Sequence, residues 1–158
     1  MRYWLFKSEP TTFSIDDLEQ SSNQITHWNG VRNYQVRNMM RDEMQIGDKA
    51  FFYHSNCSPP GIVGIIKIVK TGYPDFTAWD TTSIYFDPKS SATKPRWFMV
   101  DVQFVKKLEQ IIPLDMLKNH TALKNMAVTR TGNRLSITPV TAKEWEAILT
   151  TQFPLSAK

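Results

Sequence analysis

The order of apolar and polar positions predicts a chain of short strands with small helices between them. Strand-like runs rich in β-branched and aromatic residues cover 2–7, 48–54, 62–69, 97–105 and 135–138. Helical spacing or helix-start signals cover 14–18, 32–42, 113–118 and 141–149. A turn containing Pro and Gly divides the second strand from the third, which is typical of an antiparallel hairpin. The pattern therefore predicts an α+β fold, a mixed and largely antiparallel β-barrel with small flanking helices.

One long polar segment, residues 71–94, interrupts this pattern. It is rich in turn-forming residues, and its apolar residues follow neither the strand period nor the helix period. Loops longer than about 12–15 residues are often functional, and this one carries Tyr73, Trp79 and Tyr85. We therefore expect an excursion over the surface. No linker or composition shift divides the chain, so residues 1–158 are expected to form one domain.

The composition excludes several classes of protein. A single cysteine, Cys57, rules out an internal disulfide framework and a thiolate zinc site, and the three histidines are spread out with no HExxH spacing. The longest apolar run, Gly61–Ile66, is far shorter than the roughly 18 residues of a membrane span. We therefore expect no metal and no membrane association. No signal peptide precedes the first strand, so a cytoplasmic location is expected.

The charge favours a polyanionic partner without requiring one. Nineteen Lys and Arg against fifteen Asp and Glu give a net charge of +4, which solubility alone could also explain. Three arginines, Arg32, Arg37 and Arg41, fall in one predicted helix among amide and aromatic residues. Lys and Arg hold phosphates while flat rings stack on bases, so this helix suits a nucleic acid. The same spacing also fits a solvated helix face.

Familiar catalytic and nucleotide-binding motifs are absent from the sequence. It contains no GxGxxG, GxxxxGK[ST] or GxSxG pattern, and no cofactor is predicted. His54 and Cys57 stand three residues apart, but they straddle a turn, which makes a Cys–His nucleophile pair a weak hypothesis. The sequence therefore offers polar and aromatic recognition groups more readily than a catalytic set.

Seven short motifs, however, follow one another along nearly the whole chain. They are WLFKSEP at 4–10, WNGVRNYQVRN at 28–38, FFYHSN at 51–56, GYPD at 72–75, YFDPK at 85–89, PRW at 95–97 and RLSITPV at 134–140. Together they resemble the EVE domain, a member of the PUA-like superfamily that is related to the YTH readers of methylated adenine in RNA. Val36 and the Ile137-Thr138 pair depart slightly from the family pattern, outside the expected pocket.

The resemblance implies a PUA-like fold and a pocket that reads a modified base, a cytosine or an adenine, in DNA or RNA. It implies no established reaction and no cofactor. By similarity to the YTH readers, Trp28 would form one wall of this pocket. The residues expected to line the pocket are Lys7, Ser8, Glu9, Trp28, Asn33, Tyr34, Tyr53, His54 and Ser55.

Physical arguments support the same assignment. Stacking on an aromatic side chain stabilises a bound base by about 1–3 kcal/mol, which Trp28 could supply, and the polar residues could identify the base edge. Arg32, Arg37 and Arg130 would then hold the flanking phosphates. The sequence does not indicate an oligomeric state.

Other interpretations remain open from the sequence. Trp28 could instead be a hydrophobic staple before a helix, and His54 could be a structural histidine. The main alternative function is a small hydrolase acting on a modified nucleoside, with Lys7 beside Glu9 as a proton-transfer or nucleophile-activating pair. An interaction module with no nucleic-acid role is a third hypothesis.

Overall fold

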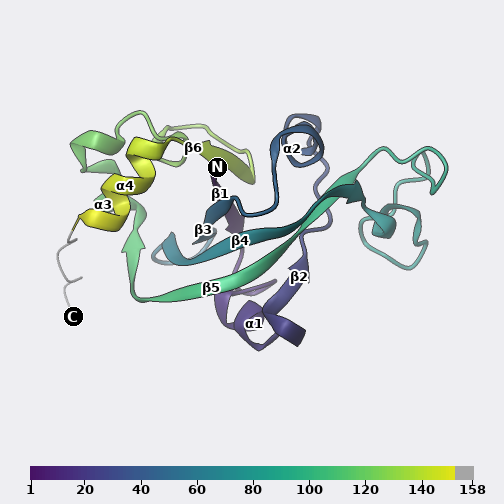
Figure 1. Ribbon diagram of the computed structural model, residues 1–158, viewed down its shortest axis with the longest axis horizontal. Helices are drawn as coiled ribbons and strands as arrows, with labels where there is room; N and C mark the ends of the chain where they lie inside the picture. The colour runs from purple at the N-terminus through teal and green to yellow at the C-terminus, as the bar shows by residue number, and fades with distance from the viewer. Residues whose placement is uncertain (152–158) are drawn as a thin grey trace.

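The architecture is a six-stranded mixed sheet with short helices around it. The computed structural model describes residues 1–151 (Figure 1). Its strands are β1 (Tyr3–Ser8), β2 (Ile25–His27), β3 (Lys49–His54), β4 (Gly61–Pro74), β5 (Phe98–Pro113) and β6 (Ile137–Val140). They are ordered β2-β5-β4-β3-β1-β6, and every pair is antiparallel except β1 with β3. The predicted α+β class and largely antiparallel sheet are confirmed, although no pairing within residues 1–151 joins β2 to β6 to close a barrel.

Four short α-helices accompany the sheet. They are α1 (Ile15–Gln20), α2 (Tyr34–Asn38), α3 (Leu114–Lys118) and α4 (Ala142–Thr150). Capping boxes begin α1 at Ser14 and α4 at Thr141, where each hydroxyl accepts a backbone N–H and a carboxylate three residues later reaches back. The predicted helix 32–42 is split, because α2 passes into a π-helical turn at Met39–Glu43. No helix of residues 1–151 is long and apolar enough to span a membrane.

Side-chain alternation along β1 and β3 divides the core between the two faces of the sheet. Trp4, Phe6 and Phe52 pack on one face with apolar residues of α1 and α2. Leu5 and Phe51 pack on the other face with residues of α3 and α4. This division follows from the two-residue period of a strand. At the ends of β1 and β3, neighbouring side chains therefore point to opposite faces of the sheet and contact different parts of the protein.

Two strands are longer than the pattern predicts, and one was missed. β4 and β5 pair from Gly61 opposite Pro113 to Pro74 opposite Phe98, so the long polar loop shrinks to residues 75–97. In Figure 1 this loop lies at one end of β4 and β5, and α3 and α4 lie at the opposite end. Backbone hydrogen bonds between β4 and β5 stabilise the polar ends of both strands. The alternation of apolar and polar side chains does not reveal such bonds. The three-residue strand β2 is held in the same way, by β5.

The last predicted strand is displaced by two residues, to Ile137–Val140. Pro139 lies inside it, which the sequence pattern disfavours for a central strand. Because β6 pairs with β1 alone and forms an edge of the sheet, the missing backbone N–H of this proline disrupts no inner pairing.

Candidate functional site

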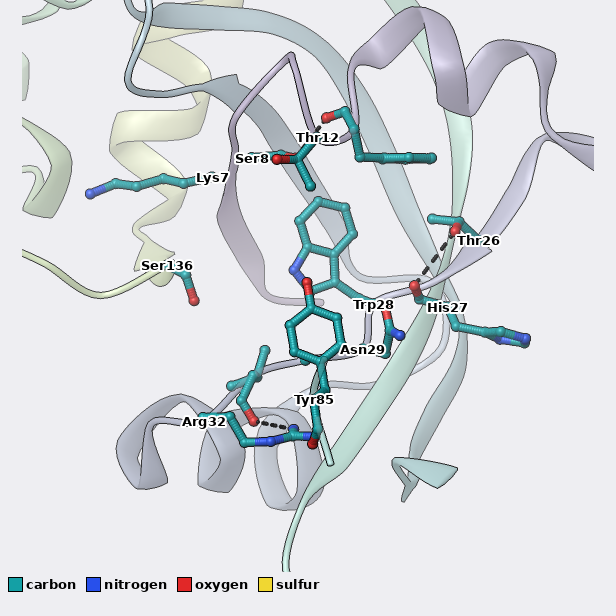
Figure 2. Close-up of a pocket in the computed structure, with 13 residues that line it drawn as sticks. Lys7, Ser8, Thr12, Thr26, His27, Trp28, Asn29, Arg32, Tyr85 and Ser136 are labelled. Carbon is teal, nitrogen blue, oxygen red and sulfur yellow. Dashed lines mark hydrogen bonds between the residues drawn. The ribbon is translucent and has the colours of Figure 1, made fainter. Parts of the chain in front are cut away.

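A pocket of about 410 Å³ opens beside the carboxyl end of β1 (Figure 2). Three parts of the chain build most of its wall: the end of β1, the segment that follows β2, and the 75–97 loop. Its lining includes Lys7, Ser8, Phe13, Trp28, Asn29, Gly30, Val31, Arg32, Tyr85 and Ser136. The pocket therefore combines aromatic surface with amide, hydroxyl and cationic groups.

Trp28 serves both as packing and as pocket wall. Its ring lies edge-on to Phe6 at a centroid distance of 5.0 Å and to Phe52 at 5.7 Å. Its backbone N–H donates to the carbonyl of Val100 at 2.8 Å, which ties the segment after β2 to β5. The half-buried indole is thus held against the core while it lines the pocket, and it is not a hydrophobic staple, because the helix that follows is capped by Asn33, five residues later.

Tyr85 and Phe13 are aromatic residues of the pocket that sequence reasoning missed. The Tyr85 ring lies against Gly30, where a Cβ atom would come within 2.5 Å of the ring carbons, and Gly30 has a φ of +81°. Glycine is required here both by that contact and by the left-handed backbone. The only sequence signals for Tyr85 were its place in the long loop and in the YFDPK motif.

A buried carboxylate fixes the position of the 75–97 loop against the pocket. Asp75 is fully buried, and its Oδ2 accepts hydrogen bonds from the Gly30 N–H at 2.8 Å and from Arg32 Nη1 at 3.1 Å. Arg32 also donates to the backbone carbonyl of Tyr85. Asp75 and Arg32 therefore connect the segment after β2 to the loop that supplies Tyr85.

Two of the arginines predicted to contact phosphate are bound within the protein. The Arg32 guanidinium lies 5.7 Å from the ring centroid of Tyr85 and 5.3 Å from that of Trp97. Tyr34 stacks on Trp97 with a centroid distance of 4.7 Å, and Arg37 covers Tyr34 and donates to a backbone carbonyl of the loop. Tyr34 and Arg37 thus belong to a stacked column that braces the loop, and neither lines the pocket.

Three further predicted residues lie outside the pocket lining, and their side chains are engaged by other groups of the protein. Asn33 caps α2, with its Oδ1 accepting the Val36 N–H at 3.1 Å. Glu9 accepts a hydrogen bond from the Asn56 side-chain amide, and His54 Nε2 accepts the Ile15 N–H at 3.1 Å. In the structure these three residues therefore do not line the pocket beside Trp28.

The remaining predicted residues lie around a second hollow, on the other side of β1. Tyr53, Ser55 and Arg130 line it, together with Lys7, which also borders the first pocket. Strand alternation explains this, because Tyr53 faces away from its neighbour Phe52 and hence away from Trp28. Burial raises the pKa of Tyr53 to about 12, so its hydroxyl stays protonated.

The chemistry of a hydrolase or a metal centre is not assembled here. Lys7 and Glu9 form no ion pair or hydrogen bond with each other, and the Glu9 carboxylate is engaged by Asn56. Within the part of the chain that is described, no three His, Cys, Asp or Glu side chains are grouped to hold a metal ion. The side chains of Asn29 and Ser136 and the Tyr85 hydroxyl, in contrast, form no hydrogen bond with the rest of residues 1–151 and remain available to a ligand.

The hydrogen bond of His54 predicts a pH dependence of stability. Burial lowers the pKa of His54 from its usual 6.5, and the neutral ring accepts the Ile15 N–H that begins α1. The folded state therefore favours the neutral ring over the protonated one. The contribution of this ring to the free energy of unfolding is complete above about pH 6.5, the ordinary pKa of histidine. It declines as the pH falls from there towards the lowered pKa of His54 in the folded state.

Urea denaturation between about pH 7.5 and 5, on the wild type and on His54→Gln, measures this contribution. Carboxyl groups titrate in both proteins, so the difference between the two curves isolates His54. We expect the wild type to lose more stability than the variant over this interval. Parallel curves would exclude the assigned role.

Comparison with known proteins shows close relatives over nearly the whole chain. The family model of the EVE domain matches residues 2–151. Human thymocyte nuclear protein 1 is 48% identical over 164 aligned positions, which cover 93% of this chain and 72% of that protein.

Solved structures extend this similarity to the fold. A Pseudomonas syringae protein superposes with a TM-score of 0.87 at 49% identity, covering 93% of this chain and 97% of that one. The human THYN1 protein, in complex with 5-methylcytosine-containing DNA, superposes with a TM-score of 0.90 at 44% identity, covering 98% of this chain and 100% of that one.

Proposed function

The chain belongs to the EVE domain family, and from that premise we propose that it binds DNA and holds a modified cytosine in the pocket beside Trp28. The observation that carries the proposal is this pocket, whose aromatic wall and unbonded polar groups suit a single base. The related human protein was solved with 5-methylcytosine-containing DNA, which favours cytosine over adenine and DNA over RNA.

The pocket contains the interactions that a reader of an extruded base requires. Taking a base out of its stack costs a few kcal/mol, which stacking and hydrogen bonds to the base edge must offset. Trp28 and Tyr85 supply the aromatic surface, and Asn29 and Ser136 supply donors and acceptors. Phe13, on the same wall, offers apolar contact for a methyl group.

Lys7 and Ser8 both line the pocket, and they would contribute to binding in different ways. The Ser8 hydroxyl already donates to the Phe13 carbonyl at 2.6 Å, so Ser8 shapes the wall and can still accept a hydrogen bond. The Lys7 ammonium forms no hydrogen bond or ion pair within residues 1–151 and is available to an anionic group.

The proposal is tested by titrating the protein with matched oligonucleotides. Single- and double-stranded DNA should carry cytosine, 5-methylcytosine or N6-methyladenine at one position, at two salt concentrations. We expect tighter binding of 5-methylcytosine at both salt concentrations, because base contacts carry specificity whereas phosphate contacts weaken with salt. Equal affinity for all three bases would refute the proposal.

Gly30→Ala is expected to reduce this preference while leaving the chain folded. The added methyl group meets the ring of Tyr85 and requires a left-handed backbone, so Tyr85 must move from the pocket wall. The backbone strain alone costs roughly 1–2 kcal/mol.

The matched control is Gly47→Ala, which also needs a left-handed backbone, with a φ of +95°, but has open space around its Cβ position and lines neither hollow. Thermal melting of both variants and their affinities for the paired oligonucleotides separate the two effects. An unchanged preference in Gly30→Ala would mean that Tyr85 has no part in binding.

A further inference from the structure

The second hollow has a strongly basic lining. It measures about 390 Å³, and Lys7, Lys118 and Arg130 contribute to its wall. Tyr53, Ser55, Asn56, Thr131 and Asn133 add hydroxyl and amide groups, and no carboxylate lines it. A concave surface with three cations and several neutral hydrogen-bond donors matches the chemistry of a phosphate group.

Lys7 connects this hollow with the pocket beside Trp28. It pairs with Tyr53 in the register of β1 and β3, and its side chain lies on the face opposite Phe6. Figure 2 shows the Lys7 ammonium directed away from the indole of Trp28. The two hollows therefore lie on opposite sides of the end of β1, with Lys7 as their common wall.

The positive charges of the hollow are not neutralised by the protein. None of Lys7, Lys118 and Arg130 belongs to an ion pair within residues 1–151. Burial lowers the pKa of Lys7, as expected for a half-buried ammonium without a counterion. The Glu9 carboxylate accepts a hydrogen bond from the side-chain amide of Asn56, which lines the hollow, and Glu9 itself is not part of the lining.

We propose that this basic hollow binds a backbone phosphate of the DNA strand whose base enters the pocket beside Trp28. The inference rests on the proposed function. Phosphate contacts set the position of a strand, and base contacts then specify it. A phosphate held on the far side of Lys7 would fix the strand so that one nucleotide at a time meets the aromatic pocket. The hollow would thus take the role that the sequence analysis assigned to Arg32 and Arg37, since the side chains of both are occupied within the protein.

The test compares two double variants that each remove two positive charges. Lys118→Gln/Arg130→Gln changes residues that line only the basic hollow and leaves Lys7 intact. The control, Lys49→Gln/Lys67→Gln, changes two exposed lysines that face each other across β3 and β4, at the other end of β3. Any general effect of net charge is therefore common to both.

The measured quantity is the salt dependence of the affinity for a single-stranded oligonucleotide with one 5-methylcytosine. Each phosphate contact contributes about 0.7 to the slope of log K against log salt concentration on a single strand. We expect the Lys118→Gln/Arg130→Gln slope to be less steep than wild type by about 0.7, the contribution of one phosphate, with the preference for 5-methylcytosine over cytosine unchanged. The control should keep the slope closer to that of the wild type.

Neutral methylphosphonate linkages beside the modified base identify the contact directly. One such linkage should weaken binding by the wild type and by the control, and should cause little further loss in Lys118→Gln/Arg130→Gln. Additive losses would mean that the phosphate and the two residues do not interact, and would overturn the proposal.

The outcomes separate this proposal from the proposed function. An unchanged slope together with an intact base preference overturns only the phosphate contact. If the wild type binds all bases equally, the proposed reading of a modified base is refuted. The comparison of the salt slopes of the wild type and the two double variants then still tests the phosphate contact. Competition with inorganic phosphate distinguishes the source of the ligand. If inorganic phosphate binds through Lys118 and Arg130 but the DNA slope does not change, the hollow is a site for a small anion and the strand contact is refuted.

Discussion

Trp28→Ala is expected to abolish the preference for a modified cytosine. Stacking of a base on an aromatic side chain is worth about 1–3 kcal/mol, so its loss should weaken binding by about 5- to 150-fold. The 5-methylcytosine oligonucleotide should lose more affinity than the cytosine one. The two share the same phosphate contacts, and only the modified base is expected to stack on Trp28. Fluorescence anisotropy with matched cytosine and 5-methylcytosine oligonucleotides measures both affinities.

The contacts of Trp28 with Phe6 and Phe52 require controls for folding. Removing a buried large aromatic costs about 3–5 kcal/mol of stability, and the half-buried Trp28 should cost less. Trp28→Phe retains an aromatic face and should keep part of the preference. Trp79→Ala removes another half-buried tryptophan that lines neither hollow, and should leave the preference intact. Equal loss in Trp79→Ala would assign the effect to general destabilisation.

Asp75→Ala is expected to have the largest effect on stability. Asp75 is fully buried and accepts hydrogen bonds from Gly30, Arg32 and Thr77. Breaking a fully buried charge pair by removing one partner costs about 3–5 kcal/mol, and the loss here should be smaller, because the Arg32 side chain is 26% exposed and keeps the Tyr85 carbonyl as a partner. The 75–97 loop should then detach from Gly30 and carry Tyr85 away from the pocket. Urea denaturation and DNA binding should both be impaired.

The same loop contains a matched control for this variant. Asp80 accepts the N–H and the hydroxyl of Thr82 as Asp75 accepts those of Thr77, but Asp80 is exposed and has no long-range partner. Asp80→Ala should therefore change the free energy of unfolding far less. If the two variants were equally stable, the link from Asp75 to Gly30 and Arg32 would not hold the loop.

Local sequence was sufficient to predict most of the framework. The helix-start signals at Ser14 and Thr141 are interactions between near neighbours in the chain, so local sequence could predict where α1 and α4 begin. The missed strand β2 and the extended ends of β4 and β5 have a different cause, because backbone pairing with a distant segment decides them. The edge position of β6 likewise explains why Pro139 can lie inside a strand.

The candidate site was predicted less completely than the framework. Trp28, Lys7 and Ser8 were identified from motifs and do line the pocket, but Tyr85 was not assigned to it. Tyr85 reaches the pocket only because Arg32 bonds its carbonyl and Gly30 leaves room for its ring. Neither contact has a signature in the sequence near Tyr85.

The sequence by itself determined which residues are polar, aromatic or apolar, where strands alternate, and which motifs indicate the EVE family. Only the tertiary structure decided which polar groups remain available for a ligand. His54, Arg32 and Arg37 looked like recognition groups, yet their partners are the Ile15 N–H and backbone carbonyls of the 75–97 loop. Such partners lie far away in the chain, and a side chain that satisfies a buried backbone group is no longer free to bind a ligand. That competition arises only when distant segments pack together, so the sequence pattern alone could not settle it.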